Sequence, residues 1–169
     1  MNSDIKDFMN IIFFRTLTFL IILSLFYCSS RKNTETAEYK MDQDRILKKG
    51  RLVEWAFNNN RMDTVLSDFW NSDSAAFIVN GHKIEGYKNI LARFEQRRES
   101  KNHMKIHLIN DKVIMLTLAS AIHMASFDQI VEDSLNRKKH FKGTWTTVYH
   151  FMDNHWTVIN LHESFYPLD

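Results

Sequence analysis

The sequence has little cysteine and almost no net charge. Its single cysteine, Cys28, excludes an intrachain disulfide and a zinc site built from several cysteines. Lysine and arginine exceed aspartate and glutamate only by 22 to 20, so the chain lacks the basic field that nucleic-acid binding requires. We therefore expect no nucleic-acid partner. The sequence also has no internal repeat and no low-complexity stretch.

An apolar run over residues 16–27 precedes Cys28. Its length suits the hydrophobic region of a signal peptide and falls short of the roughly 20 residues that span a bilayer. An apolar run that ends in a lone cysteine before Ser29 and Ser30 resembles the lipobox of bacterial lipoproteins, whose cysteine is lipidated. Tyr27 stands where a lipobox has a small residue, so an uncleaved anchor that starts at Ile11, or a cytosolic start, stays open.

These features predict three segments. Residues 1–28 are expected to form a signal peptide or membrane anchor with Cys28 as the lipidation site, and the polar residues 29–41 a flexible tether. Residues 42–169 are expected to form one domain. We expect the protein in the bacterial cell envelope, anchored to the membrane and facing the periplasm or the exterior.

Apolar positions at helical spacing predict helices over residues 42–58, 62–70 and 87–98. A strand over 75–79 with a turn at Asn80 and Gly81 predicts a hairpin before the third helix. Further strands are predicted over 103–109 and 112–127, with a turn at Asn110 and Asp111 between them and a loop over 128–139 afterwards. The 112–127 strand is apolar on both sides, so we expect helices to cover one face and another chain, strand layer or ligand the other.

Two β-branched and aromatic runs within residues 141–166, joined by a polar turn at 152–155, predict a long antiparallel hairpin. A two-stranded ribbon alone is marginally stable in water, so the hairpin needs further strands and a layer of helices. The expected class is α+β, with three N-terminal helices packed on a curved antiparallel sheet.

This order of elements resembles the nuclear transport factor 2-like superfamily over about residues 42–166. The segment 69–86, with Val79-Asn80-Gly81 and then Glu85-Gly86 before a helix, is similar to the first hairpin of the SnoaL-like and uncharacterised ketosteroid-isomerase-like families. The runs over 147–150, 153–156 and 161–164 are similar to the closing hairpin of the association domain of calcium/calmodulin-dependent protein kinase type II. The resemblance implies a cone-shaped fold with a pocket.

The resemblance also implies where catalytic groups would lie. The general base, the tyrosine and the protonated aspartate of ketosteroid isomerase correspond to Val79, Val53 and Thr147. A valine takes no proton, and a threonine replaces a buried carboxylic acid poorly. The association domains often carry at the position of Thr147 an arginine that binds a carboxylate, and this arginine is missing too. We therefore lean towards a protein that is not an enzyme.

Strand alternation puts Trp145, Thr147 and Tyr149 on one face, and Ile159, Leu161 and Glu163 on one face of the next strand. By the resemblance these faces line a concave pocket, which also takes residues from the helices and other strands. The predicted ligand-binding residues are Val53, Phe57, Phe69, Val79, His123, Trp145, Thr147, Tyr149, Leu161 and Glu163. His123 and Glu163 are candidates for an acid/base pair; alternatively, Glu163 lies in solvent and His123 is an ordinary hydrogen-bonded strand residue.

Histidine spacing does not predict a metal site. His103 and His107 would share a strand face about 13 Å apart, because the chain rises about 3.3 Å per residue. His150 and His162 would face each other across the closing hairpin as one pair at most. We expect neither a metal nor a cofactor.

Two functions follow. The first is a membrane-tethered, non-catalytic module that binds a small apolar molecule or forms a homodimer through its sheet. The second is a SnoaL-like, metal-independent isomerase, cyclase or hydrolase that acts on an apolar polycyclic substrate, with His123 or Glu163 as the base.

Overall fold

The computed structural model describes residues 38–100 and 102–168. The chain divides into two compact units, Met1–Met41 and Asp42–Asp169. The predicted signal peptide or anchor, Cys28 and residues 29–37 lie outside the described residues, whereas residues 38–41, predicted as tether, are helical. Within the described ranges, no helix combines the length and the apolar character that a membrane crossing needs.

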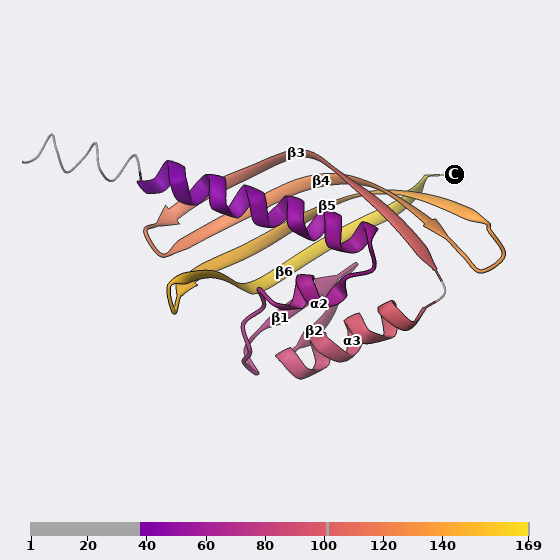
Figure 1. The fold of residues 1–169 in the computed structure, drawn as a ribbon, viewed down its shortest axis with the longest axis horizontal. Helices are drawn as coiled ribbons and strands as arrows, with labels where there is room; N and C mark the ends of the chain where they lie inside the picture. Colours follow the sequence, from indigo (N-terminus) through magenta and orange to yellow (C-terminus); the bar gives the residue numbers. More distant parts are fainter. Residues whose placement is uncertain (1–37, 101, 169) are drawn as a thin grey trace, which may run out of the picture. The chain divides into compact units, whose positions relative to one another are not determined.

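The unit Asp42–Asp169 is α+β, with a curved sheet of six strands (Figure 1). A helix over residues 38–58 precedes the other elements. These are α2 (Met62–Leu66), β1 (Ala76–Val79), β2 (His82–Glu85), α3 (Tyr87–Glu99), β3 (His103–Thr117), β4 (Ser120–Glu132), β5 (Lys138–Met152) and β6 (His155–Leu168).

The strands lie side by side in the order β2-β1-β6-β5-β4-β3. All neighbours are antiparallel except β1 and β6, which run parallel with Phe77 opposite Leu161. The predicted purely antiparallel sheet is therefore wrong at this one pairing. The relative direction of β1 and β6 could not be predicted, because no local turn joins the two strands and only the fold brings them together.

The closing hairpin is confirmed. Strands β5 and β6 pair from His140 opposite Leu168 to Met152 opposite His155. The turn residues Asp153 and Asn154 have φ angles of 51° and 62°. Two successive positive φ angles are typical of the type I′ turn, whose twist matches that of the flanking strands.

The turn predicted at Asn110 and Asp111 is wrong. Both residues lie inside β3, where the pairing with β4 shifts register between Ile109 and Lys112. Asn110 has a φ of 54°, which a turn or a bulge can equally use, so the sequence signal was real but its structural meaning was a bulge. The hairpin turn lies instead between Thr117 and Ser120.

The loop predicted over residues 128–139 is shorter, because β4 extends to Glu132 and β5 starts at Lys138. The Asp133 side chain holds the remaining loop closed. Its Oδ1 accepts hydrogen bonds from the backbone N–H groups of Leu135 and Arg137, and its Oδ2 accepts one from the Arg137 guanidinium. Polar residues continue the strands here because cross-strand pairing, rather than burial, keeps them extended.

The core lies between the helices and one face of the sheet. Phe94 of α3 packs against three other rings, with centroid distances of 6.2 Å to Phe57, 6.2 Å to Phe69 and 5.5 Å to Phe77. Ile46, from the helix over 38–58, is fully buried. Aromatic packing of this kind joins the long helix, α3 and the β1 strand at one end of the sheet.

The opposite face of the sheet is partly open. We expected both faces of residues 112–127 to be covered, but Ile114 and Leu116 are 36% and 55% exposed. Within the described residues nothing covers them, so only the helix-covered side of this segment is core. A homodimer through the sheet stays a prediction.

Gly143 of β5 is packed so tightly that it leaves no room for a side chain. A Cβ atom there would lie 2.4 Å from Cζ of Phe127 and 2.6 Å from the carbonyl oxygen of Ser164. We predict that Gly143→Ala lowers the free energy of unfolding by about 1–3 kcal/mol, because the backbone must shift to admit the methyl group. Urea denaturation measures the loss. Thr144→Ala, at the neighbouring exposed position, is the control, and an equal loss there would contradict the packing argument.

Candidate functional site

Two rows of paired residues build the site on the covered face of the sheet. Across the strands, Val113 pairs with His123, His123 with Thr147, Thr147 with Leu161 and Leu161 with Phe77. Paired residues of neighbouring strands point to the same side, so these side chains form one line across the sheet. The next row contains Ala125, Trp145, Glu163 and Val79.

These rows, with the long helix and the α2 segment, enclose an inner pocket. Its volume is about 20 Å³, room for about one water molecule. Nine of the ten predicted ligand-binding residues line it, and Val79 lines an adjoining hollow instead. The lining residues are Gly50, Val53, Phe57, Val65, Asp68, Phe69, His123, Trp145, Thr147, Tyr149, Val158, Leu161 and Glu163.

His123 is the most enclosed polar group of the inner pocket, with 1% of its surface exposed. Burial lowers the pKa of its imidazole, and the nearby carboxylate of Asp111 opposes this effect only in part. The Nε2 atom lies 3.9 Å from Oδ2 of Asp111, too far for a hydrogen bond. Within the described residues, Nε2 has no hydrogen-bond partner, and neither has Nε1 of Trp145. Two side chains of the pocket lining thus carry buried ring nitrogens that no group of the described chain satisfies.

The long helix approaches His123 at Gly50. A Cβ atom on Gly50 would lie 2.5 Å from Cε1 of the imidazole, so any side chain there would force either the helix or the His123 ring to shift. This contact gives the pocket its small size. It also excludes water from the ring, which is the physical cause of the lowered pKa of His123.

Glu163 lies at the other end of the pocket. It is 9% exposed, and it borders both the inner pocket and the adjoining hollow that contains Arg93 and Arg97. Burial raises the pKa of the Glu163 carboxyl, although the charges of Arg97 and Arg93 lower it. The predicted alternative of a solvent-exposed Glu163 is therefore wrong, because the covering elements enclose this end of β6.

Asp68, which lines the inner pocket, belongs to a partly buried ion pair. Nζ of Lys49, on the long helix, donates a hydrogen bond to Oδ1 of Asp68, which follows α2. Burial raises the pKa of the neighbouring Tyr149 hydroxyl, and the charge of Asp68 raises it further. Tyr149 is therefore a neutral hydroxyl at any ordinary pH, able to donate but not to act as a base.

The candidate polar residues share a pocket but form no hydrogen-bonded triad. His123 and Thr147 are direct cross-strand partners. Glu163 lies two strands away from His123 and two residues further along, which puts the two Cα atoms about 12 Å apart by standard sheet dimensions. Within the described residues, no hydrogen bond joins any two of the three. Direct proton exchange between His123 and Glu163 would need a ligand between them.

Sequence reasoning missed Gly50, Val65, Asp68 and Val158. Gly50 carries no side chain, so no apolar pattern could mark it. Val158 points inward because β6 carries a bulge opposite Val148 and Tyr149, where Ile159 is the extra residue. The bulge moves Ile159 out of the face that it was predicted to share with Leu161. The Val158 N–H donates a hydrogen bond to the Asp68 carbonyl, and the Val158 carbonyl accepts one from the Trp70 N–H. These two bonds hold Asp68 beside the pocket.

The remaining histidines are dispersed. His150 pairs with Thr157 and His162 with Thr146, so the predicted His150–His162 pair is wrong, because the turn at Asp153 and Asn154 already sets His150 opposite Thr157. His107 is largely exposed beside Glu54. In the part of the chain that the structure describes, no group of three His, Cys, Asp or Glu side chains is arranged to hold a metal ion.

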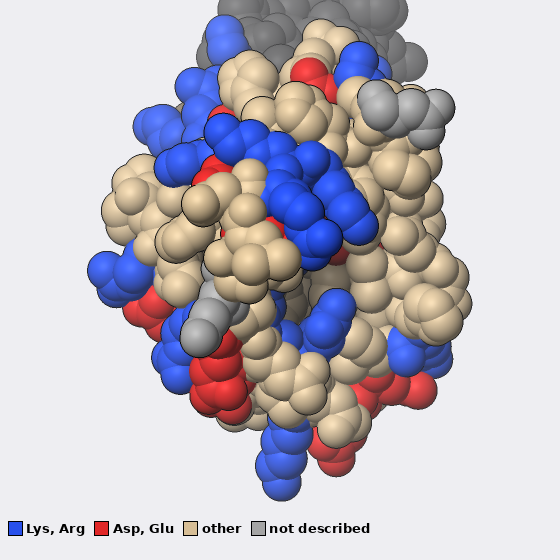
Figure 2. All heavy atoms as spheres, turned by 90° about the vertical axis from the view of Figure 1, so that its right-hand side faces the viewer, with Lys and Arg blue, Asp and Glu red and all other residues tan. Residues whose placement is uncertain are grey.

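A second, open cleft adjoins the inner pocket at Phe57, which lines both. Its volume is about 830 Å³, and it lies between the end of the long helix, α3 and the start of β3. Figure 2 shows a hollow at this end of the protein with Lys and Arg side chains gathered around it. The cleft is therefore both larger and more positively charged than the inner pocket.

The lowered pKa of His123 predicts a pH-dependent stability. Above about pH 6.5 the imidazole is neutral in the folded and unfolded states. As the pH falls below this value, the unfolded chain binds a proton that the folded protein refuses, so stability is lost until the folded pKa is reached. We predict that wild type loses up to about 1.4 kcal/mol per pH unit more than His123→Asn does in this range. Urea denaturation from pH 7.5 to 5 tests this, and parallel curves would contradict it.

Comparison with known proteins identifies the fold. No protein-family model matches the chain, and no curated protein matches it. A solved protein of unknown function from Shewanella oneidensis, described as nuclear transport factor 2-like, is 22% identical, with a TM-score of 0.56 over 72% of this chain and 97% of that one.

Two further solved structures are similar. A candidate calcium/calmodulin-dependent protein kinase II association domain from Xanthomonas campestris is 19% identical, with a TM-score of 0.55 over 66% of this chain and 78% of that one. The hexachlorocyclohexane dehydrochlorinase LinA-type3 from Novosphingobium barchaimii is 13% identical, with a TM-score of 0.66 over 79% of this chain and 94% of that one. The chain therefore has the nuclear transport factor 2-like fold.

Proposed function

We propose that the domain binds a small, mainly apolar molecule in the inner pocket. The observation that carries this proposal is the pair of unsatisfied ring nitrogens, Nε2 of His123 and Nε1 of Trp145, inside a largely apolar enclosure. Buried polar groups are normally hydrogen-bonded, and leaving one unpaired costs about 1–3 kcal/mol. A ligand with one hydroxyl or carbonyl group on an apolar body would satisfy them.

The pocket must widen to admit such a ligand. Phe57 separates the inner pocket from the open cleft, because its ring lines both spaces. Movement of this ring would join them and give a ligand a path to His123. Ligand pockets typically measure about 300–1,000 Å³, and the cleft lies within that range whereas the closed pocket does not.

A second candidate function is metal-independent proton transfer on an apolar substrate, of the isomerase, cyclase or hydrolase kind. It is favoured by the place of the His123 imidazole in the pocket lining, although burial lowers the pKa of this ring and so makes it a weaker base. The distance from Glu163 weighs against a two-residue acid/base mechanism. We therefore rank binding first.

The binding proposal predicts discrimination between two simple probes. Phenol can donate a hydrogen bond to Nε2 of His123, whereas its methyl ether, anisole, has no proton to donate. We expect phenol to bind about 10-fold more tightly than anisole, measured by the fluorescence change of Trp145 or by calorimetry. His123→Phe should abolish the difference, because phenylalanine keeps the ring but has no nitrogen.

The matched control is His162→Phe, on the exposed side of β6. It should leave the preference for phenol unchanged. Equal affinities for the two probes in wild type, no saturable binding of either, or a preference that survives His123→Phe would each refute the proposal. Circular dichroism verifies that both variants fold.

We further propose that lipidation at Cys28 holds this domain at the membrane, on the strength of the apolar run over residues 16–27. Full-length protein expressed in a bacterial host should appear in the membrane fraction with a mass that includes an acylated N-terminal cysteine. Cys28→Ser should release the domain or leave an unprocessed precursor. A Cys28→Ser chain that stays in the membrane and differs in mass from wild type only by the exchange of sulfur for oxygen would exclude lipidation.

A further inference from the structure

The open cleft carries a concentration of positive charge that the inner pocket does not explain. We propose that the cleft binds a small organic anion with an apolar body, whose carboxylate or phosphate group is held between Arg93 and Arg97. The site shares only Phe57 with the inner pocket, and it does not depend on the function proposed there.

The described part of the cleft lining is positively charged. Arg93, Arg97 and Lys105 line it together with His103, and among the described residues no Asp or Glu does. Arg93 and Arg97 are four residues apart on α3, so they lie on one face of the helix, where like charges destabilise it. A bound anion would convert this repulsion into two attractions.

Arg97 is the centre of the site. Its guanidinium lies 4.8 Å from the centre of the Phe57 ring, and its Nη2 contacts Sδ of Met104 at the start of β3. These contacts hold the planar group in place without neutralising it, because a thioether and a ring face are weak partners for a cation. Within the described residues, neither Arg97 nor Arg93 forms an ion pair with a carboxylate.

Burial and charge both act on Arg97. Burial lowers the pKa of its guanidinium; the carboxylate of Glu163 raises it and the charge of Arg93 lowers it. Glu163 is a weak counter-ion, because burial raises its own pKa and its carboxylate forms no ion pair with either arginine in the described chain. A half-buried guanidinium with five donors therefore faces the cleft with its charge largely uncompensated.

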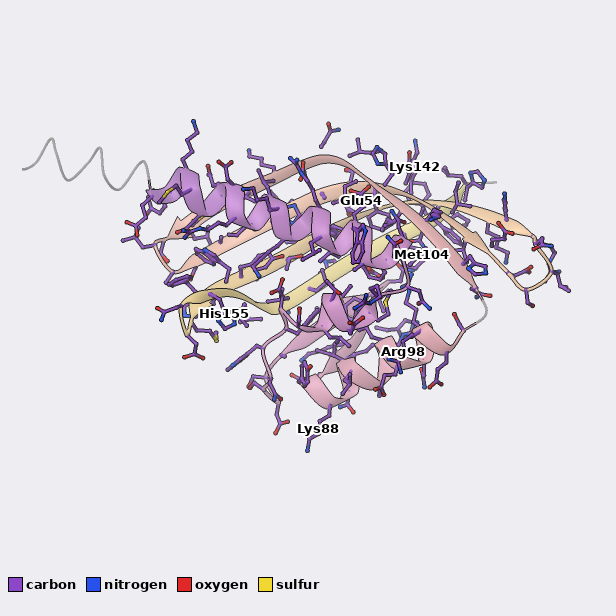
Figure 3. The ribbon with its side chains drawn as sticks, viewed as in Figure 1. Glu54, Lys88, Arg98, Met104, Lys142 and His155 are labelled. Carbon is purple, nitrogen blue, oxygen red and sulfur yellow. The ribbon has the colours of Figure 1, made fainter. Side chains whose placement is uncertain are left out.

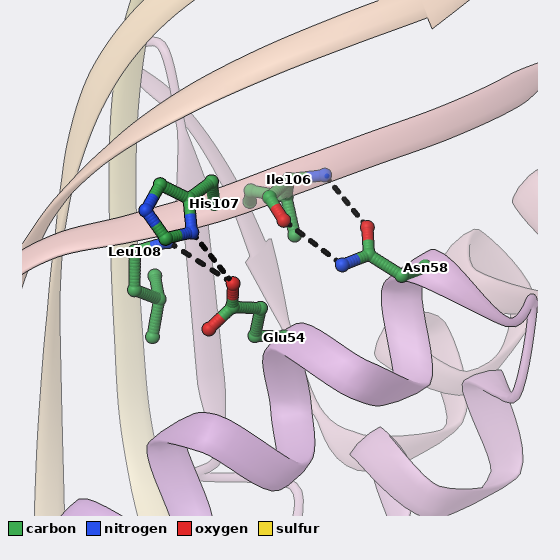
Figure 4. A network of polar contacts seen from close by, with 5 residues as sticks. All are labelled: Glu54, Asn58, Ile106, His107 and Leu108. Atoms are coloured by element: carbon green, nitrogen blue, oxygen red, sulfur yellow. Dashed lines mark hydrogen bonds and ion pairs between the residues drawn. The ribbon is translucent and has the colours of Figure 1, made fainter.

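Asn58, a polar residue of the cleft lining, is already engaged. The side-chain amide of Asn58 donates to the Ile106 carbonyl at 2.9 Å, and its oxygen accepts from the Ile106 N–H at 2.7 Å (Figure 4). Beside it, Glu54 of the same helix accepts hydrogen bonds from Nδ1 of His107 and the Leu108 N–H. These contacts tie the long helix to β3, an edge strand, and so fix one wall of the cleft.

The shape of the cleft indicates the class of anion. Phe57, Met62, Met104 and Val131 supply apolar surface beside the arginines. A volume of about 830 Å³ is large for an inorganic ion and suits an organic molecule of drug-like size. Arginine binds both carboxylate and phosphate through two parallel hydrogen bonds, so both groups fit the geometry.

The test is a titration of the folded full-length protein with paired probes, followed by calorimetry. Phenylacetate and phenyl phosphate carry the anion on an apolar ring, phenylacetamide is the neutral counterpart, and inorganic phosphate lacks the ring. We expect saturable binding of phenylacetate or phenyl phosphate, at least 10-fold tighter than that of the amide or of inorganic phosphate. The stronger of the two aromatic anions distinguishes a carboxylate site from a phosphate site.

The variants Arg93→Gln and Arg97→Gln should each weaken anion binding about 10-fold or more. Arg98→Gln is the matched control, because Arg98 lies on the same helix as Arg97 (Figure 3) but does not line the cleft. It should change the affinity by less than 2-fold. If Arg97→Gln fails to fold, Arg97→Lys keeps the charge but loses the planar fork, and it should still weaken binding.

Three results would overturn the proposal. The first is the absence of saturable binding for every anionic probe. The second is an equal loss in Arg98→Gln and Arg93→Gln, which would indicate only general electrostatic attraction. The third is binding of phenylacetamide as tight as that of phenylacetate. None of these results depends on whether phenol binds near His123.

Discussion

The close approach of the long helix to the sheet at Gly50 determines the character of the inner pocket. With no side chain between the helix and His123, the imidazole is sealed from water, which lowers its pKa and leaves Nε2 without a hydrogen-bond partner. The same contact restricts the pocket to about the size of one water molecule. A larger residue at position 50 would admit water, and the environment of His123 would change with it.

Two irregularities of the sheet place the carboxylates of Asp111 and Asp68 near the site. The bulge in β3 contains Asp111, which lies 3.9 Å from His123. The bulge between β5 and β6 turns Val158 inward, and its backbone holds Asp68 beside Tyr149. In a regular strand the side chains alternate strictly between the two faces of the sheet. Each bulge adds one residue and so changes the face to which the side chains beyond it point.

In the unit Asp42–Asp169, a largely apolar pocket and a positively charged cleft meet at Phe57. The inner pocket is largely apolar, whereas the cleft on the other side of Phe57 contains Arg93 and Arg97. Phe57 belongs to both, because one part of its ring packs in the core and its face stacks under the Arg97 guanidinium. The net charge of +2 conceals this arrangement, since acidic residues elsewhere balance the cleft.

The sequence by itself determined the α+β class, the closing hairpin and most of the pocket lining. Period-2 alternation placed Trp145, Thr147 and Tyr149 on one face, and the polar turn placed the end of the hairpin, because these signals are local. Only the tertiary structure decided the parallel pairing of β1 with β6, the two bulges, the contact of Gly50 with His123 and the arginine-lined cleft. Each of these depends on contacts between residues far apart in the chain, and neither periodicity nor turn chemistry encodes such contacts.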